Sequence, residues 1–160
     1  MKNCSFTGHR QIPDHHARPL ADLLARAIDY AYGQGCRNFY TGGALGFDTL
    51  CARAIIRYRL LHRDVRLILV LPCRNQAQLW SDRQISSYEY TLAEADEIVY
   101  TSDEYDNECM RKRNAYLAEV CDMMIAYLGK TRSGAYQTVG MAKRLGKQVF
   151  NLYHSAENAN

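Results

Sequence analysis

The sequence lacks long apolar runs and closely paired cysteines, and it carries little net charge. No stretch of 18 consecutive apolar residues occurs, so we expect no membrane-spanning helix. The N-terminus turns polar by Thr7-Gly8-His9-Arg10, which is not the pattern of a signal peptide. None of the six cysteines forms a C-x-x-C pair, which argues against a structural zinc site. We expect buried, reduced cysteines, a cytoplasmic location and no membrane partner.

The composition is that of a folded domain. The 160 residues are 48% hydrophobic, and the formal net charge is only +3, so disorder is excluded as the main state. The length suits a single core, and we predict one domain over residues 1–160. A net charge this low does not favour nucleic acid as the partner.

Apolar periodicity predicts alternating strands and helices. The expected strands cover residues 3–7, 36–40, 65–71, 97–100, 122–128 and 148–153. The expected helices cover residues 20–31, 47–58, 81–95, 110–119 and 135–145. This order predicts an α/β, Rossmann-like, doubly wound and mainly parallel sheet of about six strands, with helices on both faces. Residues 154–160 are expected to form a frayed tail.

Three glycine-containing segments follow expected strands. They are Thr7-Gly8-His9-Arg10, the run from Gly42 to Asp48, and the run from Gly129 to Ala135. Glycine lets backbone N–H groups approach a phosphate, and a helix N-terminus adds partial positive charge. Tight strand-to-helix turns need glycine as well, so one such loop is weak evidence. A complete P-loop and a G-x-G-x-x-G fingerprint are both absent.

The candidate ligand-binding residues lie in these segments and at the start of the helix over 110–119. They are Thr7, Gly8, Arg10, Gly42, Gly43, Gly46, Asp48, Arg113, Asn114, Ser133 and Gly134. Arg10 suits phosphate contact, and Ser133 with Gly134 offers hydroxyl and backbone donors. Asp48 is compatible with accepting ribose hydroxyls or with a favourable helix N-terminal charge. Trp80, the only tryptophan, is compatible with base stacking or with packing of a helix on the sheet.

The same motifs resemble a known family. They are Ser5-Phe6-Thr7-Gly8-His9-Arg10, the run Gly42-Gly43-Ala44-Leu45-Gly46-Phe47-Asp48, Pro72 with Gln76 and Trp80, and Arg113-Asn114. They are similar to the YpsA-like branch of the SLOG superfamily (Smf/DprA–Lonely Guy). The resemblance implies a Rossmann-like domain that binds nucleotides or nucleotide-derived ligands such as ADP-ribose. Its relatives include Lonely Guy phosphoribohydrolases and DNA-processing protein A, which binds single-stranded DNA; the resemblance also implies a homodimer.

One departure from this family concerns catalysis. The phosphoribohydrolases carry a P-G-G-x-G-T-x-x-E motif with a catalytic glutamate. The corresponding stretch here, residues 132–138, has no paired glycine, and residues 124–155 contain no Asp or Glu. We therefore favour a binding domain over an enzyme. No cofactor is predicted with certainty apart from the nucleotide ligand.

Acidic residues are concentrated in one block. Residues 82–108 hold nine acidic residues and one basic residue. The block is compatible with a solvated surface or with a loop that borders the site. Asp48, Glu104 and Glu108 are weak candidates for a catalytic carboxylate. The histidines have no metal-ligand spacing, His15-His16 is expected in an exposed loop, and no metal is predicted.

Three functions remain open from the sequence. The first is a nucleotide-binding, sensor-type domain with phosphates on the glycine-rich loops. The second is a nucleoside-monophosphate N-glycosidase that uses a different carboxylate. The third is single-stranded DNA binding, because twelve tyrosines offer stacking surfaces, although nucleic acid is the least favoured partner.

Overall fold

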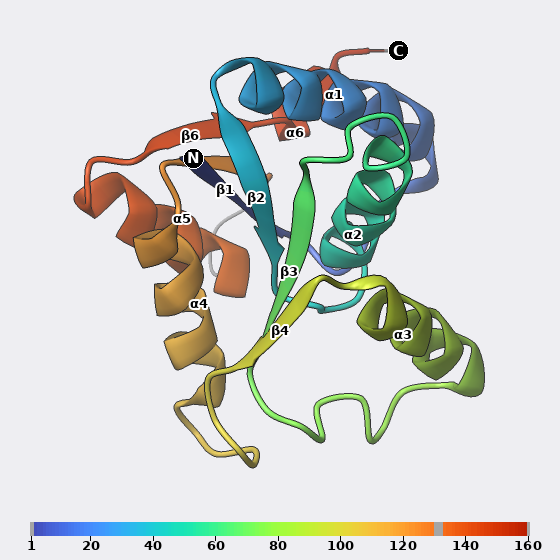
Figure 1. Cartoon of the computed structure of the whole chain (residues 1–160), viewed down its shortest axis with the longest axis vertical. Helices are drawn as coiled ribbons and strands as arrows, with labels where there is room; N and C mark the ends of the chain where they lie inside the picture. Colours follow the sequence, from blue (N-terminus) through green and yellow to red (C-terminus); the bar gives the residue numbers. More distant parts are fainter. Residues whose placement is uncertain (1, 130–132, 160) are drawn as a thin grey trace.

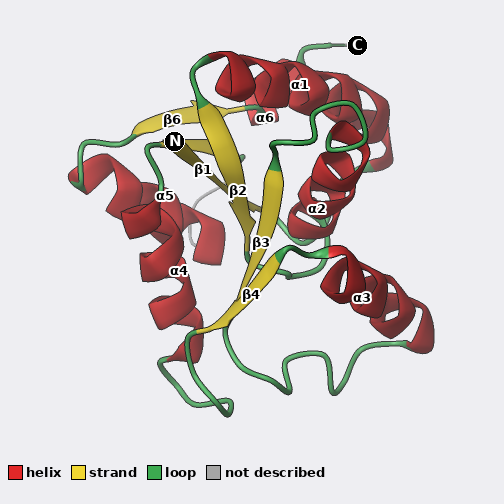
Figure 2. Cartoon of the chain, viewed as in Figure 1, coloured by secondary structure: helices red, strands yellow, loops and turns green. Residues whose placement is uncertain are grey.

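The computed structural model describes residues 2–129 and 133–159, so residues 130–132 of the third glycine-containing segment lie outside the described residues. The strands are β1 (Lys2–Gly8), β2 (Cys36–Thr41), β3 (Arg66–Leu71), β4 (Glu97–Tyr100), β5 (Met123–Tyr127) and β6 (Gln148–Asn151). The helices are α1 (Asp14–Gly33), α2 (Phe47–Tyr58), α3 (Asp82–Glu94), α4 (Cys109–Val120), α5 (Gly134–Arg144) and α6 (Tyr153–Glu157). Figure 2 shows how strands and helices alternate along this chain.

The six strands form one sheet in the order β4-β3-β2-β1-β5-β6, and every described pair is parallel. Helices α1, α2 and α3 lie on one side of the sheet, and α4 and α5 lie on the other (Figure 1). The predicted α/β, Rossmann-like fold is therefore confirmed.

The central strand β1 separates the two halves of the sheet. Its Ser5 lies beside Tyr40 of β2 and also beside Met124 of β5. The chain builds β1 to β4 in one direction and then returns to place β5 on the other side of β1. This reversal of strand order opens a crevice at the carboxyl ends of β1 and β5, where α/β sheets bind ligands.

Side chains alternate between the two faces of the sheet with the period of two that strands impose. On β3, Leu67, Leu69 and Leu71 join the large core under α1 and α2. Ile68 and Val70 pack on the opposite side with Leu117 of α4. The apolar run that predicted a strand buried on both faces is explained by these two cores.

Helix α1 begins earlier than the sequence predicts. It starts at Asp14, so Pro19 lies inside the helix and not in its first turn. The proline forfeits one backbone hydrogen bond, but His16, Leu20 and Leu24 are all buried on one face and extend the packed stripe upstream. The expectation of an exposed His15-His16 loop is wrong, because both residues lie in α1; His15 is exposed, but the His16 side chain is fully buried.

The predicted frayed tail over 154–160 also needs correction for its described residues, 154–159. Residues 153–157 form α6, which packs on α1. Leu152 and Ala156, four residues apart, are buried and attach this helix to the core. Two apolar residues are too few to reveal a helix by periodicity.

Among the described residues, no helix combines the length and the apolar character needed to cross a membrane.

Candidate functional site

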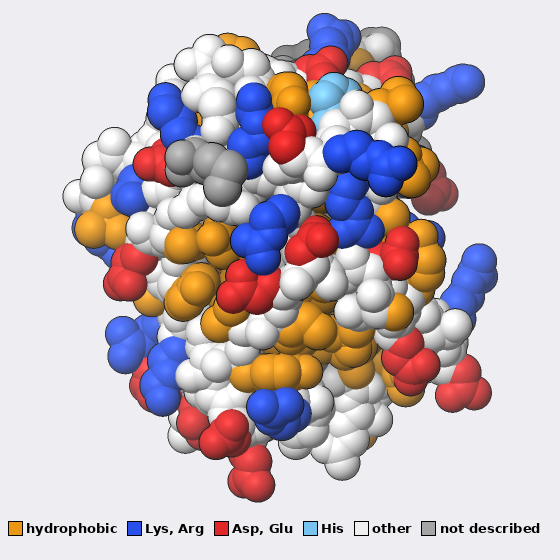
Figure 3. All heavy atoms as spheres, in the orientation of Figure 1, with side chains coloured by type: hydrophobic (Ala, Val, Ile, Leu, Met, Phe, Trp, Pro, Cys, Tyr) orange, Lys and Arg blue, Asp and Glu red, His pale blue; other side chains and the backbone are white. Residues whose placement is uncertain are grey.

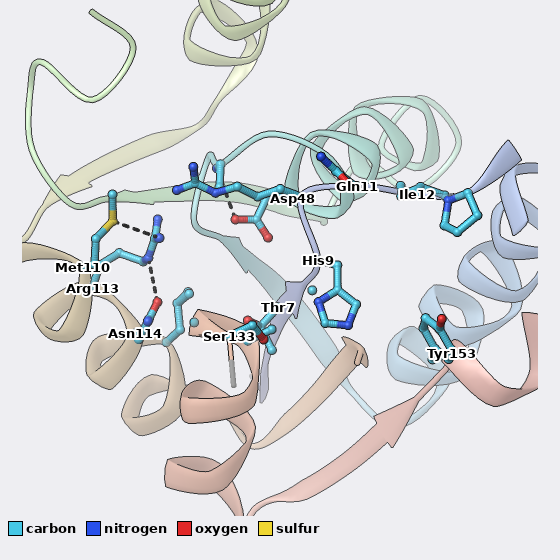
Figure 4. A pocket seen from close by; sticks show the side chains of 17 residues that line it. Thr7, His9, Gln11, Ile12, Asp48, Met110, Arg113, Asn114, Ser133 and Tyr153 are labelled. Atoms are coloured by element: carbon cyan, nitrogen blue, oxygen red, sulfur yellow. Dashed lines mark hydrogen bonds between the residues drawn. The ribbon is translucent and has the colours of Figure 1, made fainter. Parts of the chain in front are cut away.

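A cavity of about 890 Å³ opens at the crevice between the carboxyl ends of β1 and β5. Figure 4 shows the labelled side chains arranged around one open space. Its lining residues come from the end of β1 and the loop that follows it, the start of α2 and the loop that precedes it, one face of α4, and the starts of α5 and α6. They are Thr7, Gly8, His9, Arg10, Gln11, Ile12, Pro13, Ala44, Asp48, Met110, Arg113, Asn114, Leu117, Ser133, Gly134, Ala135 and Tyr153.

The end of β1 forms the floor of the cavity. Ser5 donates a hydrogen bond to the Leu117 carbonyl of α4 (2.8 Å), so Thr7, two residues on, faces the same side of the sheet. The Thr7 side chain is buried and forms no hydrogen bond among the described residues. Gly8 lies directly against Phe47, because a Cβ added there would come within 2.4 Å of the aromatic ring. This contact packs the start of α2 against the strand end.

Asp48 places a carboxylate in the wall of the cavity. Its Oδ2 accepts a hydrogen bond from the Ala44 backbone N–H (3.2 Å), and its Oδ1 has no hydrogen-bond partner among the described residues. Burial raises the pKa of Asp48 to about 6, and the charges of Arg113 and Arg10 counteract only part of that rise. The carboxylate therefore titrates close to neutral pH.

Arg113 and Asn114 lie side by side on α4. The Arg113 guanidinium donates to the Asn114 side-chain oxygen (3.0 Å) and to the Gly42 carbonyl, and it contacts the Met110 sulfur. Burial lowers the pKa of Arg113, and Asp48 opposes the shift, so the side chain stays protonated at neutral pH. The Asn114 Nδ2 has no hydrogen-bond partner in the described structure. It lies close to Gly134, since a Cβ added to that glycine would be 3.6 Å from it.

The N-terminus of α5 faces the same space. The Ser133 hydroxyl accepts the Tyr136 N–H (3.1 Å) and caps the helix. Gly134 and Ala135 line the cavity with backbone N–H groups of the first turn, which lack partners within the helix. A helix start of this kind attracts anions.

Two further polar side chains border the cavity from β1 and the loop that follows it. The His9 Nε2 accepts the Gly129 N–H (2.9 Å), and burial lowers the pKa of His9, so the ring is neutral at pH 7 with a proton on Nδ1. Arg10 is exposed and forms no hydrogen bond or ion pair with other described residues. The described lining residues include two arginines, Arg10 and Arg113, and one carboxylate, Asp48, so their net charge is positive.

Comparison of the sequence with models of protein families shows which family the chain belongs to. The model of the YspA SLOG family (YpsA) matches residues 8–152, which include all the lining residues of the cavity except Thr7 and Tyr153. The chain belongs to the YspA SLOG family.

Relatives of this SLOG chain have similar lengths. It is 28% identical to the uncharacterized SPbeta prophage-derived protein YoqJ of Bacillus subtilis strain 168, over 82% of this chain and 85% of that protein. It is 24% identical to a UPF0398 protein of Bacillus thuringiensis strain Al Hakam, over 97% of this chain and 89% of that protein.

Solved structures share the fold at lower identity. DNA processing protein A from Streptococcus pneumoniae matches with a TM-score of 0.66 and 18% identity, over 94% of this chain but only 50% of that chain. The Helicobacter pylori protein, whose structure concerns single-stranded DNA binding, matches with a TM-score of 0.65 and 16% identity, over 94% of this chain and 64% of that one. The SLOG chain thus spans about half to two thirds of these neighbours.

The structure brings most predicted site residues of this SLOG chain together. Eight of them line the cavity, namely Thr7, Gly8, Arg10, Asp48, Arg113, Asn114, Ser133 and Gly134. Gly42, Gly43 and Gly46 are not among the lining residues and lie in the loop between β2 and α2. Gly42 fits between Arg113 and Asp48, and Gly46, with φ +79°, lies against the Arg10 backbone. Ligand contact by these eleven residues remains a prediction.

Three other candidates lie away from the cavity. Trp80 lies in the loop before α3 and contacts the Tyr88 ring of α3 edge-on at 5.1 Å, a contact that does not involve the sheet. Glu108 pairs with Arg111 (2.6 Å) on the surface, and Glu104 lines a separate hollow beside Asp103 and Lys112. Of the weak catalytic candidates, only Asp48 borders the cavity.

Sequence reasoning missed several lining residues. Met110 and Leu117 lie three residues before Arg113 and three after Asn114, so helical spacing alone would have found them. Tyr153 follows the strand on the far side of β5 and carries no local signal in the sequence. The only sequence signal for His9 is its position between the candidate residues Gly8 and Arg10.

Proposed function

We propose that this SLOG domain binds a nucleotide or a nucleotide-derived anion in the cavity at the end of β1. One observation carries the proposal: the start of α5, whose first-turn N–H groups lack partners within the helix, faces the same cavity as Arg10, whose side chain forms no hydrogen bond or ion pair with other described residues. A phosphate group suits this pair because helix N-termini and arginine are the common protein partners of phosphate. The volume of about 890 Å³ lies within the range of small-molecule sites.

The remaining walls match the rest of such a ligand. Asp48 offers an oxygen without a hydrogen-bond partner in the described structure, and a carboxylate accepts hydrogen bonds from ribose hydroxyls. Ile12, Met110 and Leu117 give apolar surface for a base. The Thr7 hydroxyl and the Asn114 amide are buried polar groups that a ligand would satisfy.

Thermal shift against AMP, ADP-ribose, NAD and cyclic and linear dinucleotides tests the proposal. We expect at least one of them to raise the melting temperature, because a ligand of the folded state stabilises it. Arg10→Ala should weaken that ligand about tenfold or more without lowering the melting temperature of the free protein. Arg63→Ala is the control, since Arg63 is exposed and far from the cavity. No stabilisation by any ligand at millimolar concentration would contradict the proposal.

The raised pKa of Asp48 favours a second candidate, hydrolysis of a nucleoside-monophosphate N-glycosidic bond. A carboxyl group with a pKa of about 6 is suited to proton transfer near neutral pH. Incubation with nucleoside monophosphates, followed by chromatography of released base, tests it. Asp48→Asn should abolish release, and Glu108→Gln, at the surface pair with Arg111, should not. Release that survives Asp48→Asn would rule out this residue as the catalytic group.

Single-stranded DNA is the third candidate, because the neighbouring structure from Helicobacter pylori concerns such binding. On the face in Figure 3, described Lys and Arg side chains are interspersed with Asp and Glu and form no continuous basic track. From this mixed charge on one face, together with the low net charge of +3, we propose that nucleic acid is not the partner. Fluorescence anisotropy with a labelled oligonucleotide should show little binding; an affinity that falls steeply with salt would contradict us.

Assembly and location are proposals as well. The resemblance to SLOG proteins supports a homodimer, which light scattering on a size-exclusion column tests. Six unpaired, buried cysteines support a reducing, cytoplasmic location. A single-chain mass in solution would contradict the dimer.

A further inference from the structure

A second cluster of polar side chains lies beside α6, outside the nucleotide cavity. It consists of His15 and His16 in the first turn of α1 and Glu157 at the end of α6. The His15 Nε2 lies 3.5 Å from the Glu157 Oε2, and the His16 Nε2 contacts the same oxygen. The three candidate ligand atoms all lie within 4.8 Å of one another, and none of these residues lines the cavity.

His16 is held in one orientation from behind. Its side chain is fully buried, and its Nδ1 shares a hydrogen bond with the hydroxyl of Tyr127, which is also fully buried. The second ring nitrogen of a metal-binding histidine usually has such a partner, which directs the first nitrogen to the metal. Here Nε2 is directed toward Glu157 and His15.

Glu157 supplies a negative charge at an accessible position. The Nε2 atoms of both histidines lie against the same oxygen of this carboxyl group, Oε2. The side chains of His15 and Glu157 are 56% and 50% exposed. An ion can therefore reach the cluster from solvent, while one ligand is anchored in the core.

We propose that His15, His16 and Glu157 bind a divalent transition-metal ion, with Zn²⁺ as the expected occupant. Two imidazoles and one carboxylate form a known zinc ligand set that leaves a fourth position for water. Nitrogen ligands favour Zn²⁺ over Mg²⁺ and Ca²⁺, which require oxygen ligands. In the metal-bound form His16 carries its proton on Nδ1 and donates it in a hydrogen bond to the Tyr127 oxygen. The ion joins the last described helix to α1.

Zinc titration of tag-free protein, first treated with EDTA and desalted, tests this site. We expect calorimetry and mass spectrometry to give one Zn²⁺ per chain, and Zn²⁺ should raise the melting temperature. His15→Ala and Glu157→Gln should each weaken binding about tenfold or more, since ligands and their supporting partners both contribute at this scale. Both residues are half-exposed, so circular dichroism should show that the variants fold.

His154→Ala is the matched control, because His154 is an exposed histidine of α6 outside the cluster. It should bind Zn²⁺ as the natural sequence does. Tyr127→Phe tests the positioning role: the absorption spectrum of bound Co²⁺ should be retained while the affinity falls about 10- to 100-fold.

Two results would overturn the proposal. One is the absence of Zn²⁺ binding by the folded protein, which would leave only the histidine–glutamate hydrogen bonds. The other is an affinity that stays unchanged in both His15→Ala and Glu157→Gln, which would assign the ion to other groups such as cysteines. Either outcome leaves the nucleotide proposal unaffected, because the two sites share no residue.

Discussion

At the scale of single residues, the cavity places a buried acid between two cations. Asp48 keeps its proton in the folded chain to about pH 6, whereas an ordinary aspartate has a pKa of 3.8. The folded state therefore binds the proton more tightly than the unfolded state. It follows that Asp48 lowers the free energy of unfolding as the pH rises through that interval.

Replacing Asp48 tests this linkage. In Asp48→Asn the side chain no longer titrates. The free energy of unfolding of this variant, relative to that of the natural protein, should therefore increase by about 3 kcal/mol as the pH rises from about 4 to about 6. Urea unfolding at several pH values measures the difference. Asp22→Asn, at an exposed aspartate of α1, is the control. A difference between Asp48→Asn and the natural protein that does not change with pH would show that Asp48 is not a buried titrating group.

Gly46 is the residue that joins the loop after β2 to the end of β1. Its φ of +79° disfavours any side chain, and a Cβ would lie 2.1 Å from the Arg10 carbonyl oxygen. Gly46→Ala should destabilise the chain by about 2 kcal/mol or more, as measured by urea unfolding. Gly33→Ala, where a Cβ meets open space at the end of α1, should be neutral or slightly stabilising. Equal effects of the two substitutions would contradict the close approach.

At the scale of elements, the capping serines of α5 and α3 differ in their position relative to the cavity. Ser133 and Ser81 both accept a backbone N–H three residues on, but only Ser133 lines the cavity. Each change to alanine should cost about 1 kcal/mol of unfolding free energy. Only Ser133→Ala should also weaken the ligand found by thermal shift. Equal loss of binding in both variants would separate α5 from the site.

Most helices and strands could be predicted from the sequence, but two features of the helices could not. The strands and α2 to α5 were predicted nearly to the residue, because long apolar patterns and the capping residue Ser81 define them. The early start of α1 and the existence of α6 were missed, since His16 and Ala156 are buried only through contact with distant segments. The same limit applies to the site: loops next to glycines were found, but Tyr153 was not.

At the scale of the whole molecule, all six thiols lie in the interior. Every cysteine is buried and unpaired, and burial raises the pKa of Cys4 and Cys51 well above the ordinary value. Because the thiolate is the reactive form, the native protein should react slowly with Ellman's reagent at neutral pH. Six thiols should react rapidly after denaturation. A fast-reacting thiol in the native state would contradict this uniform burial.

The position of β1 has a consequence for the timescale of events in the cavity. As a strand paired on both sides, it is expected to exchange its amide hydrogens with solvent only when the whole domain unfolds. Thr7 and Gly8, at its end, continue the same strand and pair with Ala126 and Tyr127 of β5, whereas the side chains of Arg10 and Gln11 are exposed. A bound ligand would thus lose little free energy to ordering the floor of its site, and most of the motion it arrests would be in those two side chains.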